Sequence, residues 1–167
     1  MLRFKGFMLV AGAIMALLGA ARLRAEQVGG LFAAGVPTLG GRFVWSDEVV
    51  DHGWRIQKHA VIGHYRLLDA SDRRQAFGTF DACLAKLNEV KKAENFPPNP
   101  KEAVIVLHGL GAGRQFMEGL SEYLEVNGNL ATINVGYPST MEDIDAYAAS
   151  LDSVIRHLDG VERVSWR

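Results

Sequence analysis

A turn of glycines after an apolar stretch is the clearest chemical signal in this chain. His108-Gly109-Leu110-Gly111 directly follows residues 103–107, which are only Ala, Val, Ile and Leu. Glycines between a strand and a helix let backbone amides face a ligand, and such amides bind anions. The ligand could be a phosphate group, or the negatively charged oxygen that forms during acyl transfer.

A dinucleotide site explains this turn poorly. Gly109 and Gly111 match the first two glycines of the Gly-x-Gly-x-x-Gly pattern, but Arg114 occupies the third position. No acidic residue closes the next predicted strand to bind a ribose, and Asn134 is its nearest polar candidate. The sequence also lacks a Gly-Lys-Ser/Thr phosphate loop. We therefore expect neither a nucleotide nor another cofactor.

Two motifs, the glycine turn and the segment at 133–140 (INVGYPST), occur together in this chain. Together they resemble the α/β-hydrolase superfamily in its lipase and esterase-like branch, and the resemblance extends over most of 42–167. It implies that the backbone N–H of Leu110 stabilises the oxyanion of an ester's tetrahedral intermediate. It also implies that His108, with Gly109 and Gly111, shapes the loop and is not the catalytic base. The implied substrate is an ester or a lipid.

The same resemblance implies a nucleophilic serine, and none of the serines in this sequence fits that position. The superfamily carries its serine in a Gly-x-Ser-x-Gly turn past the fifth strand, with the acid and the histidine later in the chain. None of the seven serines has glycine at both −2 and +2, and the nearest match, Ser121, has Gly119 before it but Tyr123 after it. We expect the N-terminal half of a serine hydrolase, cut short by an early stop, a frameshift or a fragmentary gene, and inactive alone.

The other reactive side chains show no pattern of a site. Cys83 falls on the apolar face of a predicted helix, which favours packing over reactivity. The remaining histidines have no metal-ligand spacing, so we expect no metal: they are His52, His59, His64 and His157.

A second hypothesis gives the chain no chemistry of its own. A strand predicted at 161–166 carries Val161, Val164 and Trp166 and would form an unpaired edge of the sheet. Because such an edge can pair with another chain, a non-catalytic, membrane-anchored envelope protein that binds a partner is the alternative.

Hydrophobic periodicity predicts the elements that position these motifs. The apolar run at 103–107 is typical of a parallel strand covered on both faces, and residues 130–135 are predicted to form the next strand. Apolar residues spaced by three and four predict helices at 79–94, between 116 and 128, and at 141–158. The last of these has a capping-box spacing at Ser139 and Glu142.

The fold class expected from these elements is α/β. Residues 43–68, rich in Val, Ile, Trp and Tyr, predict two or three strands in an antiparallel hairpin arrangement. A parallel β-α-β-α-β unit follows, and the whole is preceded by an N-terminal hydrophobic helix.

Residues 1–25 form a separate segment, followed by a glycine-rich linker at 26–41 and the domain at 42–167. Arg3 and Lys5 precede an uncharged run at 6–21, whose length as a helix is about 24 Å against a hydrocarbon core of about 30 Å. Its length favours a signal peptide, whereas Arg22 and Arg24 favour an uncleaved signal anchor. Both predict export: a periplasmic or secreted chain, or one anchored in the inner membrane through residues 6–21 and facing the periplasm.

The amino-acid composition excludes nucleic-acid binding and sites built from several cysteines. Eighteen Lys and Arg against 19 Asp and Glu give no electrostatic surface for nucleic acid. A single cysteine excludes an intrachain disulfide and a cysteine-based zinc site.

Overall fold

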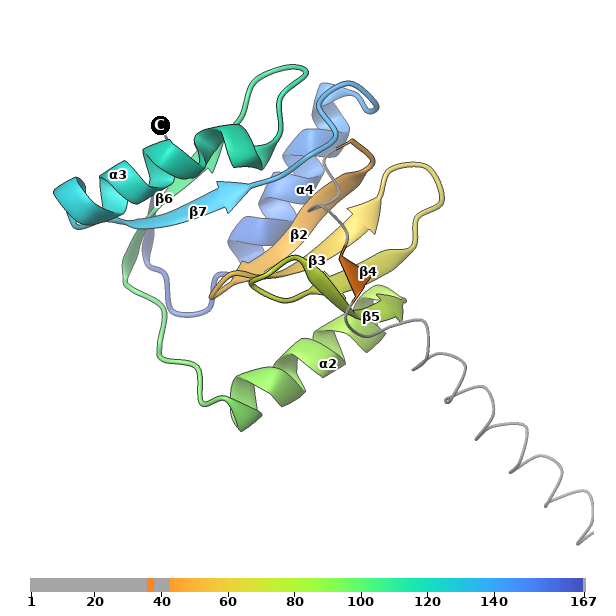
Figure 1. Cartoon of the computed structure of the whole chain (residues 1–167), viewed down its shortest axis with the longest axis horizontal. Helices are drawn as coiled ribbons and strands as arrows, with labels where there is room; N and C mark the ends of the chain where they lie inside the picture. Colours follow the sequence, from red (N-terminus) through yellow and green to blue (C-terminus); the bar gives the residue numbers. More distant parts are fainter. Residues whose placement is uncertain (1–35, 38–42, 167) are drawn as a thin grey trace, which may run out of the picture. The chain divides into compact units, whose positions relative to one another are not determined.

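The computed structural model describes residues 36–37 and 43–166, which form an α/β fold with one antiparallel and one parallel sheet (Figure 1). The predicted segment at 1–25, and the linker apart from Val36–Pro37, lie outside the described residues. Among the helices of the described part, none is long and apolar enough to cross a membrane.

The antiparallel sheet has five strands in the order β1-β5-β4-β3-β2. The strands are β1 (Val36–Pro37), β2 (Trp45–Asp51), β3 (Trp54–His59), β4 (Tyr65–Leu68) and β5 (Arg73–Gly78). Three of them fall within 43–68, as predicted. β5 was not expected, because its first three residues are Arg, Arg and Gln and hide the alternation of a strand. His52 and Gly53, with φ of 48° and 82°, form the left-handed two-residue turn that closes the β2–β3 hairpin.

Helix α2 (Phe80–Ala93) packs on this sheet and confirms the helix predicted at 79–94. It begins at Thr79, whose hydroxyl accepts a hydrogen bond from the Ala82 amide over 3.2 Å. Its apolar face completes a core of fully or almost fully buried side chains: Val49, Ile56, Leu67, Cys83 and Leu87.

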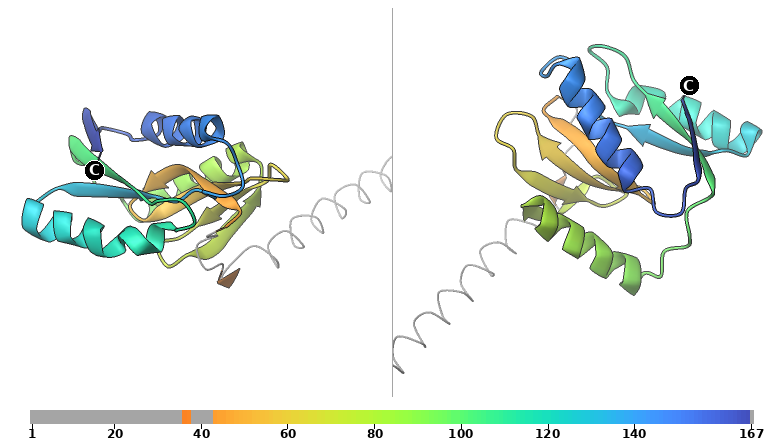
Figure 2. Two further views of the ribbon diagram at one scale, coloured as in Figure 1. Left: turned by 90° about the horizontal axis from the view of Figure 1, so that it is seen from above. Right: turned by 180° about the vertical axis from the view of Figure 1, so that it is seen from behind.

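The parallel sheet contains β6 (Glu102–Leu107), β7 (Ala131–Val135) and β8 (Arg163–Trp166) in the order β7-β6-β8. The chain passes from β6 to β7 through a short 3₁₀ helix, η2 (Arg114–Met117), and α3 (Glu118–Gly128). It passes from β7 to β8 through α4 (Ile144–Arg156). Helices α3 and α4 lie on opposite faces of the sheet (Figure 2). The predicted β-α-β-α-β order is therefore confirmed.

The start of α4 differs from the prediction. Asp143 caps the helix, because its carboxylate accepts from the Ala146 amide over 2.9 Å. The capping box expected at Ser139 and Glu142 is wrong: a tight turn follows Pro138, in which the Met141 amide donates to the Pro138 carbonyl over 2.8 Å. This turn keeps Ser139 outside the helix and frees its hydroxyl for another contact.

Strand β2 joins the two sheets. The Asp47 amide donates to the carbonyl of Gly136, just past the end of β7, over 2.8 Å. Val49 belongs to the core under α2, whereas Val50 packs with the parallel strands and α4. The start of β2 and the carboxyl end of β7 therefore lie at the same end of the fold.

Candidate functional site

Residues 108–113, here called the glycine turn, follow the middle strand of the parallel sheet. From β6 the chain crosses to β7 on one side and then returns past β6 to β8 on the other. The strand order thus reverses at β6, and open α/β sheets bind ligands at the carboxyl ends of the strands where this reversal occurs. The structure places the predicted oxyanion loop at this position.

Residues 109–112 have the geometry of a type II turn. The Ala112 amide donates to the Gly109 carbonyl over 3.2 Å, and Gly111, the third residue of the turn, has a φ of 71°. A side chain is disfavoured in that conformation, so the turn requires glycine at 111. Leu110 is the second residue, and its side chain is 85% exposed. No acceptor for its backbone N–H is found among the described residues.

A serine from the segment after β7 fixes the turn. The Gly111 amide donates to the Ser139 hydroxyl over 3.0 Å, and Ser139 is only 8% exposed. Sequence reasoning missed this contact because Ser139 also fits a helix cap and is 28 residues away. The turn therefore depends on a tertiary hydrogen bond as well as on its own glycines.

His108 is buried and supports the turn through both ring nitrogens. Its Nδ1 lies 3.0 Å from the Gly109 carbonyl, and its Nε2 accepts from the Tyr137 amide over 3.3 Å. The Tyr137 ring stacks on the imidazole at 4.0 Å, and its hydroxyl donates to the His108 carbonyl. Burial, and to a smaller extent Tyr147, raises the pKa of Tyr137, which keeps this phenol a donor. Both ring nitrogens of His108 are therefore engaged in contacts that hold the turn.

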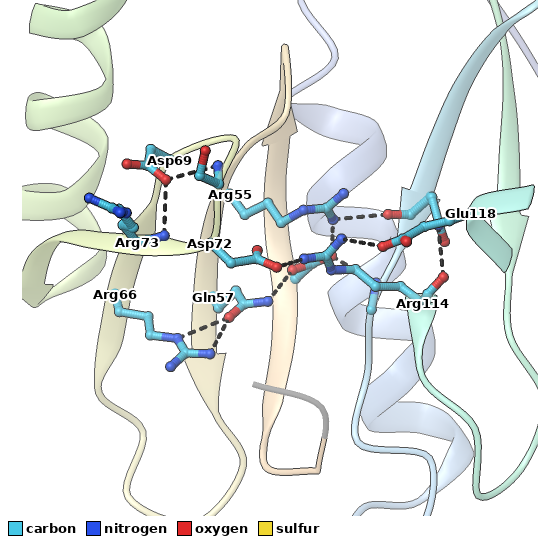
Figure 3. A network of polar contacts seen from close by, with 12 residues as sticks. Arg55, Gln57, Arg66, Asp69, Asp72, Arg73, Arg114 and Glu118 are labelled. Carbon is cyan, nitrogen blue, oxygen red and sulfur yellow. Dashed lines mark hydrogen bonds and ion pairs between the residues drawn. The ribbon is translucent and has the colours of Figure 1, made fainter. Parts of the chain in front are cut away.

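Asp47 is the centre of a buried polar network beneath the site. Its carboxylate is inaccessible to solvent and accepts from Arg55 Nη1 at 2.5 Å, Gln57 Nε2 at 2.7 Å and the Gly136 amide at 2.7 Å. Gln57 in turn accepts from two nitrogens of the Arg66 guanidinium, at 2.9 and 2.7 Å (Figure 3). Burial lowers the pKa of Arg66 to about 10, against the opposing effect of Asp47. The network ties the antiparallel sheet to the segment after β7.

Arg114 anchors the other side of the glycine turn. Its guanidinium forms an ion pair with Asp72 in the β4–β5 turn and lies 3.7 Å from the Glu118 carboxylate (Figure 3). Its carbonyl accepts from the Asn134 side chain over 2.9 Å, and the Asn134 carbonyl accepts from Arg55 over 2.9 Å. Asn134, considered above only as a ribose contact, is a structural residue here. The long separations of these partners explain why no local sequence signal revealed them.

An apolar cavity of about 200 Å³ opens at the same end of the parallel sheet, between α4 and the strands. The hydroxyls of Tyr137 and Tyr147 at its wall are bonded to the carbonyls of His108 and Pro138. The cavity is lined mostly by apolar and aromatic side chains, among them Leu107, Val135, Tyr137, Ile144, Tyr147 and Leu151.

The described residues bring no nucleophile and base together. Ser121 lies buried within α3, and no described serine hydroxyl contacts a histidine. Cys83 is fully buried, and desolvation raises the pKa of its thiol to about 11, so its reactive thiolate is disfavoured.

The other histidines are engaged away from the glycine turn. His52 Nδ1 lies 2.5 Å from the Asp51 carboxylate, and His157 Nδ1 lies 2.7 Å from the Ser153 carbonyl. Across residues 36–37 and 43–166, no group of three or more His, Cys, Asp or Glu side chains is placed to hold a metal ion.

Comparison with protein-family models, with curated proteins and with solved structures finds no match for this chain. The likeness to α/β hydrolases is therefore carried by the two sequence motifs alone.

Proposed function

We propose that this chain forms the oxyanion-binding part of a serine ester hydrolase. The observation that carries the proposal is the backbone N–H of Leu110, which has no acceptor among the described residues. It lies in a turn that Ser139, His108 and Arg114 fix in place. A pre-positioned donor of this kind can stabilise the charge that develops on an ester carbonyl.

The apolar cavity supports an ester or lipid as the substrate class. Its walls offer apolar surface at the carboxyl end of the strands, where the acyl or alcohol part of an ester could be buried. A single oxyanion donor contributes roughly 3 kcal/mol to transition-state stabilisation. Without nucleophile and base this gives little acceleration. We therefore expect no ester turnover by these 167 residues alone.

Amide NMR tests the proposed donor directly. Titrating the ¹⁵N-labelled chain with butyrate, whose carboxylate oxygens resemble the oxyanion, should shift the Leu110 N–H resonance downfield more than other amides. Leu110→Pro should abolish binding, because proline removes the N–H yet suits the second position of a type II turn. Leu110→Ala keeps the N–H and should bind as the wild type does.

Equal butyrate binding by Leu110→Pro and Leu110→Ala would contradict the assignment of the donor. Hydrolysis of p-nitrophenyl butyrate by the purified chain, abolished by serine-directed phosphonate, would instead contradict the absence of a complete triad.

For location, we propose export through residues 1–25, with the domain outside the cytoplasm and either anchored by residues 6–21 or released. A reporter active only after export, fused after residue 167, should be active with these residues and inactive without them.

The second candidate function, a non-catalytic envelope protein that binds a partner, is favoured by one observation. In the described part of the chain, β8 pairs with β6 alone and leaves its other edge open. Crosslinking from Arg163→Cys in this edge to another envelope protein, and not from Glu122→Cys on α3, would support it.

A further inference from the structure

The turn between β3 and β4 holds two large apolar side chains in water. Val61 and Ile62 are 70% and 58% exposed. The Ala60 amide donates to the Val44 carbonyl over 2.9 Å, which places the turn beside Phe43, itself 59% exposed. Single exposed apolar residues are ordinary, but a contiguous group marks an interaction surface. We call residues 59–64 together with Phe43 the hairpin tip.

The backbone N–H groups at the start of the hairpin tip all donate within the protein. The imidazole Nδ1 of His59 accepts from the amides of Val61 at 3.1 Å and Ile62 at 3.4 Å. The His59 amide donates to the His64 carbonyl over 2.8 Å, and the Gly63 amide to the His59 carbonyl over 3.1 Å. With the Ala60 bond, all five amides from 59 to 63 have acceptors within the protein. The tip can therefore approach lipid without stranding a backbone N–H, which is one part of the cost of moving irregular backbone into lipid.

The surroundings of the tip suit a membrane surface. Residues 52–68 contain no Asp or Glu, and half-buried Lys58 lies in the strand leading to the tip. Glu142, from the loop before α4, lies near enough for the charge of Lys58 to lower the pKa of its carboxyl. Trp45 packs edge-on against His59 at 4.8 Å, and tryptophan is enriched where hydrocarbon meets headgroups. Arg55 and Arg66 of this hairpin are buried, so the charge that anionic headgroups would attract is that of Lys58.

We propose that the hairpin tip contacts the surface of a lipid bilayer. A bilayer is favoured over a protein partner because the apolar run at 6–21 is joined to Phe43 in the tip by residues 22–42. The inference thus rests on the proposed membrane segment. Trp45 pairs with His59 at the tip end of β2, and Asp47, two residues further, bonds to Gly136. Contact at the tip therefore brings the end of the fold that carries the glycine turn towards the lipid.

A polarity-sensitive fluorophore on single cysteines tests this contact. The full chain, mixed with phosphatidylcholine vesicles that contain phosphatidylglycerol, would be labelled at Ile62→Cys in the tip, Val10→Cys in the apolar run, or Lys92→Cys on α2. Native Cys83 stays unlabelled, because it is fully buried and its pKa is raised to about 11. Vesicles should shift the emission of the first two labels to the blue, and nitroxide-bearing lipid should quench them. The Lys92→Cys label should not respond.

A charge placed next to the tip label sharpens the test. Val61→Asp in the Ile62→Cys chain should abolish the blue shift, because burying the carboxylate is costly. Val126→Asp is the matched control, since Val126 is a 76% exposed valine on α3, away from the tip (Figure 1). It should leave the shift unchanged. Both positions are exposed, so both variants should fold, which circular dichroism verifies.

The outcomes separate the tip from the membrane segment. If the emission of the Ile62→Cys label stays as in water while that of the Val10→Cys label shifts, the tip contact is overturned and the membrane segment is supported. A shift at Ile62→Cys alone supports the tip and contradicts the segment. Water-like emission at both, or a shift that survives Val61→Asp, overturns the tip contact.

Discussion

Asp47 shows how one buried carboxylate determines the position of remote backbone. It receives hydrogen bonds from two side chains of β3 and from the Gly136 amide, 89 residues away in the chain. Its two oxygens satisfy the buried donors of Gln57 and Gly136 and share the Arg55 guanidinium with the Asn134 carbonyl. The segment that carries Tyr137 and Ser139 to the glycine turn begins at this amide.

Asp47→Asn should lower the free energy of unfolding by about 3–5 kcal/mol, because it leaves the buried Arg55 without its counter-charge. Urea unfolding at neutral pH measures this loss. Glu162→Gln is the control, since its ion pair with Lys101 is exposed and its loss should cost less than about 1 kcal/mol. An Asp47→Asn chain as stable as the control would show that the network contributes little.

Glu142 should make stability depend on pH. Burial raises the pKa of its carboxyl, with Glu48 and Asp143 adding to the effect and Lys58 opposing it. The folded chain therefore holds this proton more tightly than the unfolded chain, so stability falls as pH rises from the unfolded to the folded pKa. Glu142→Gln should gain stability relative to the wild type across that window and keep the gain at neutral pH. Urea unfolding over a pH series would contradict this if the difference between the two chains stayed constant.

In the loop from Gly136 to Asp143, capping of α4 and support of the glycine turn belong to two different residues. Asp143 starts α4, and Ser139 holds the glycine turn through Gly111. A short oxygen-bearing side chain near a helix start suits either role, so their positions depend on the turn after Pro138.

Replacing each residue by alanine should have different effects. Asp143→Ala should cost about 1 kcal/mol of unfolding free energy, as the loss of a helix cap does. Ser139→Ala should instead raise the hydrogen-exchange rate of the Gly111 amide, since it removes that amide's acceptor. Exchange NMR with urea unfolding of both variants distinguishes the two. If Ser139→Ala alone frayed the first turn of α4, the capping box would be the better description.

The local pattern of apolar residues predicted the helices and strands well and the candidate site only in part. The run at 103–107 and the helical spacing up to Leu158 determine the parallel unit without any tertiary information. β5 was missed because Arg73 and Arg74 at its start hide the alternation of a strand and its pairing partner β4 decides its conformation. The Leu110 turn was predicted from its glycines. Of its supports, His108 was expected from the resemblance. Ser139 and Arg114 were not, because their contacts span 20 to 42 residues.

Strand β2 couples the two hydrophobic cores of the described domain. Its neighbours Val49 and Val50 enter two different cores, one under α2 and one against α4. Neither core can loosen without disturbing the strand that belongs to both.

The two cores should therefore unfold together. Leu67→Ala in one and Ile105→Ala in the other should each cost about 2–5 kcal/mol, because both side chains are fully buried. Tryptophan fluorescence and circular dichroism should follow one urea transition in every case, and exposed Val126→Ala should leave the midpoint unchanged. Separate transitions by the two probes would show that the sheets are independent domains.

Because the thiol of Cys83 is buried, the folded chain should not respond to redox conditions. With no second cysteine in the sequence and its pKa raised to about 11, Cys83 has neither an internal partner nor the thiolate that disulfide exchange requires. Mixed disulfides can form only when α2 lifts from its sheet. Oxidation of the chain by glutathione disulfide should therefore report unfolding, and the folded chain should keep its thiol in reducing and oxidising surroundings alike.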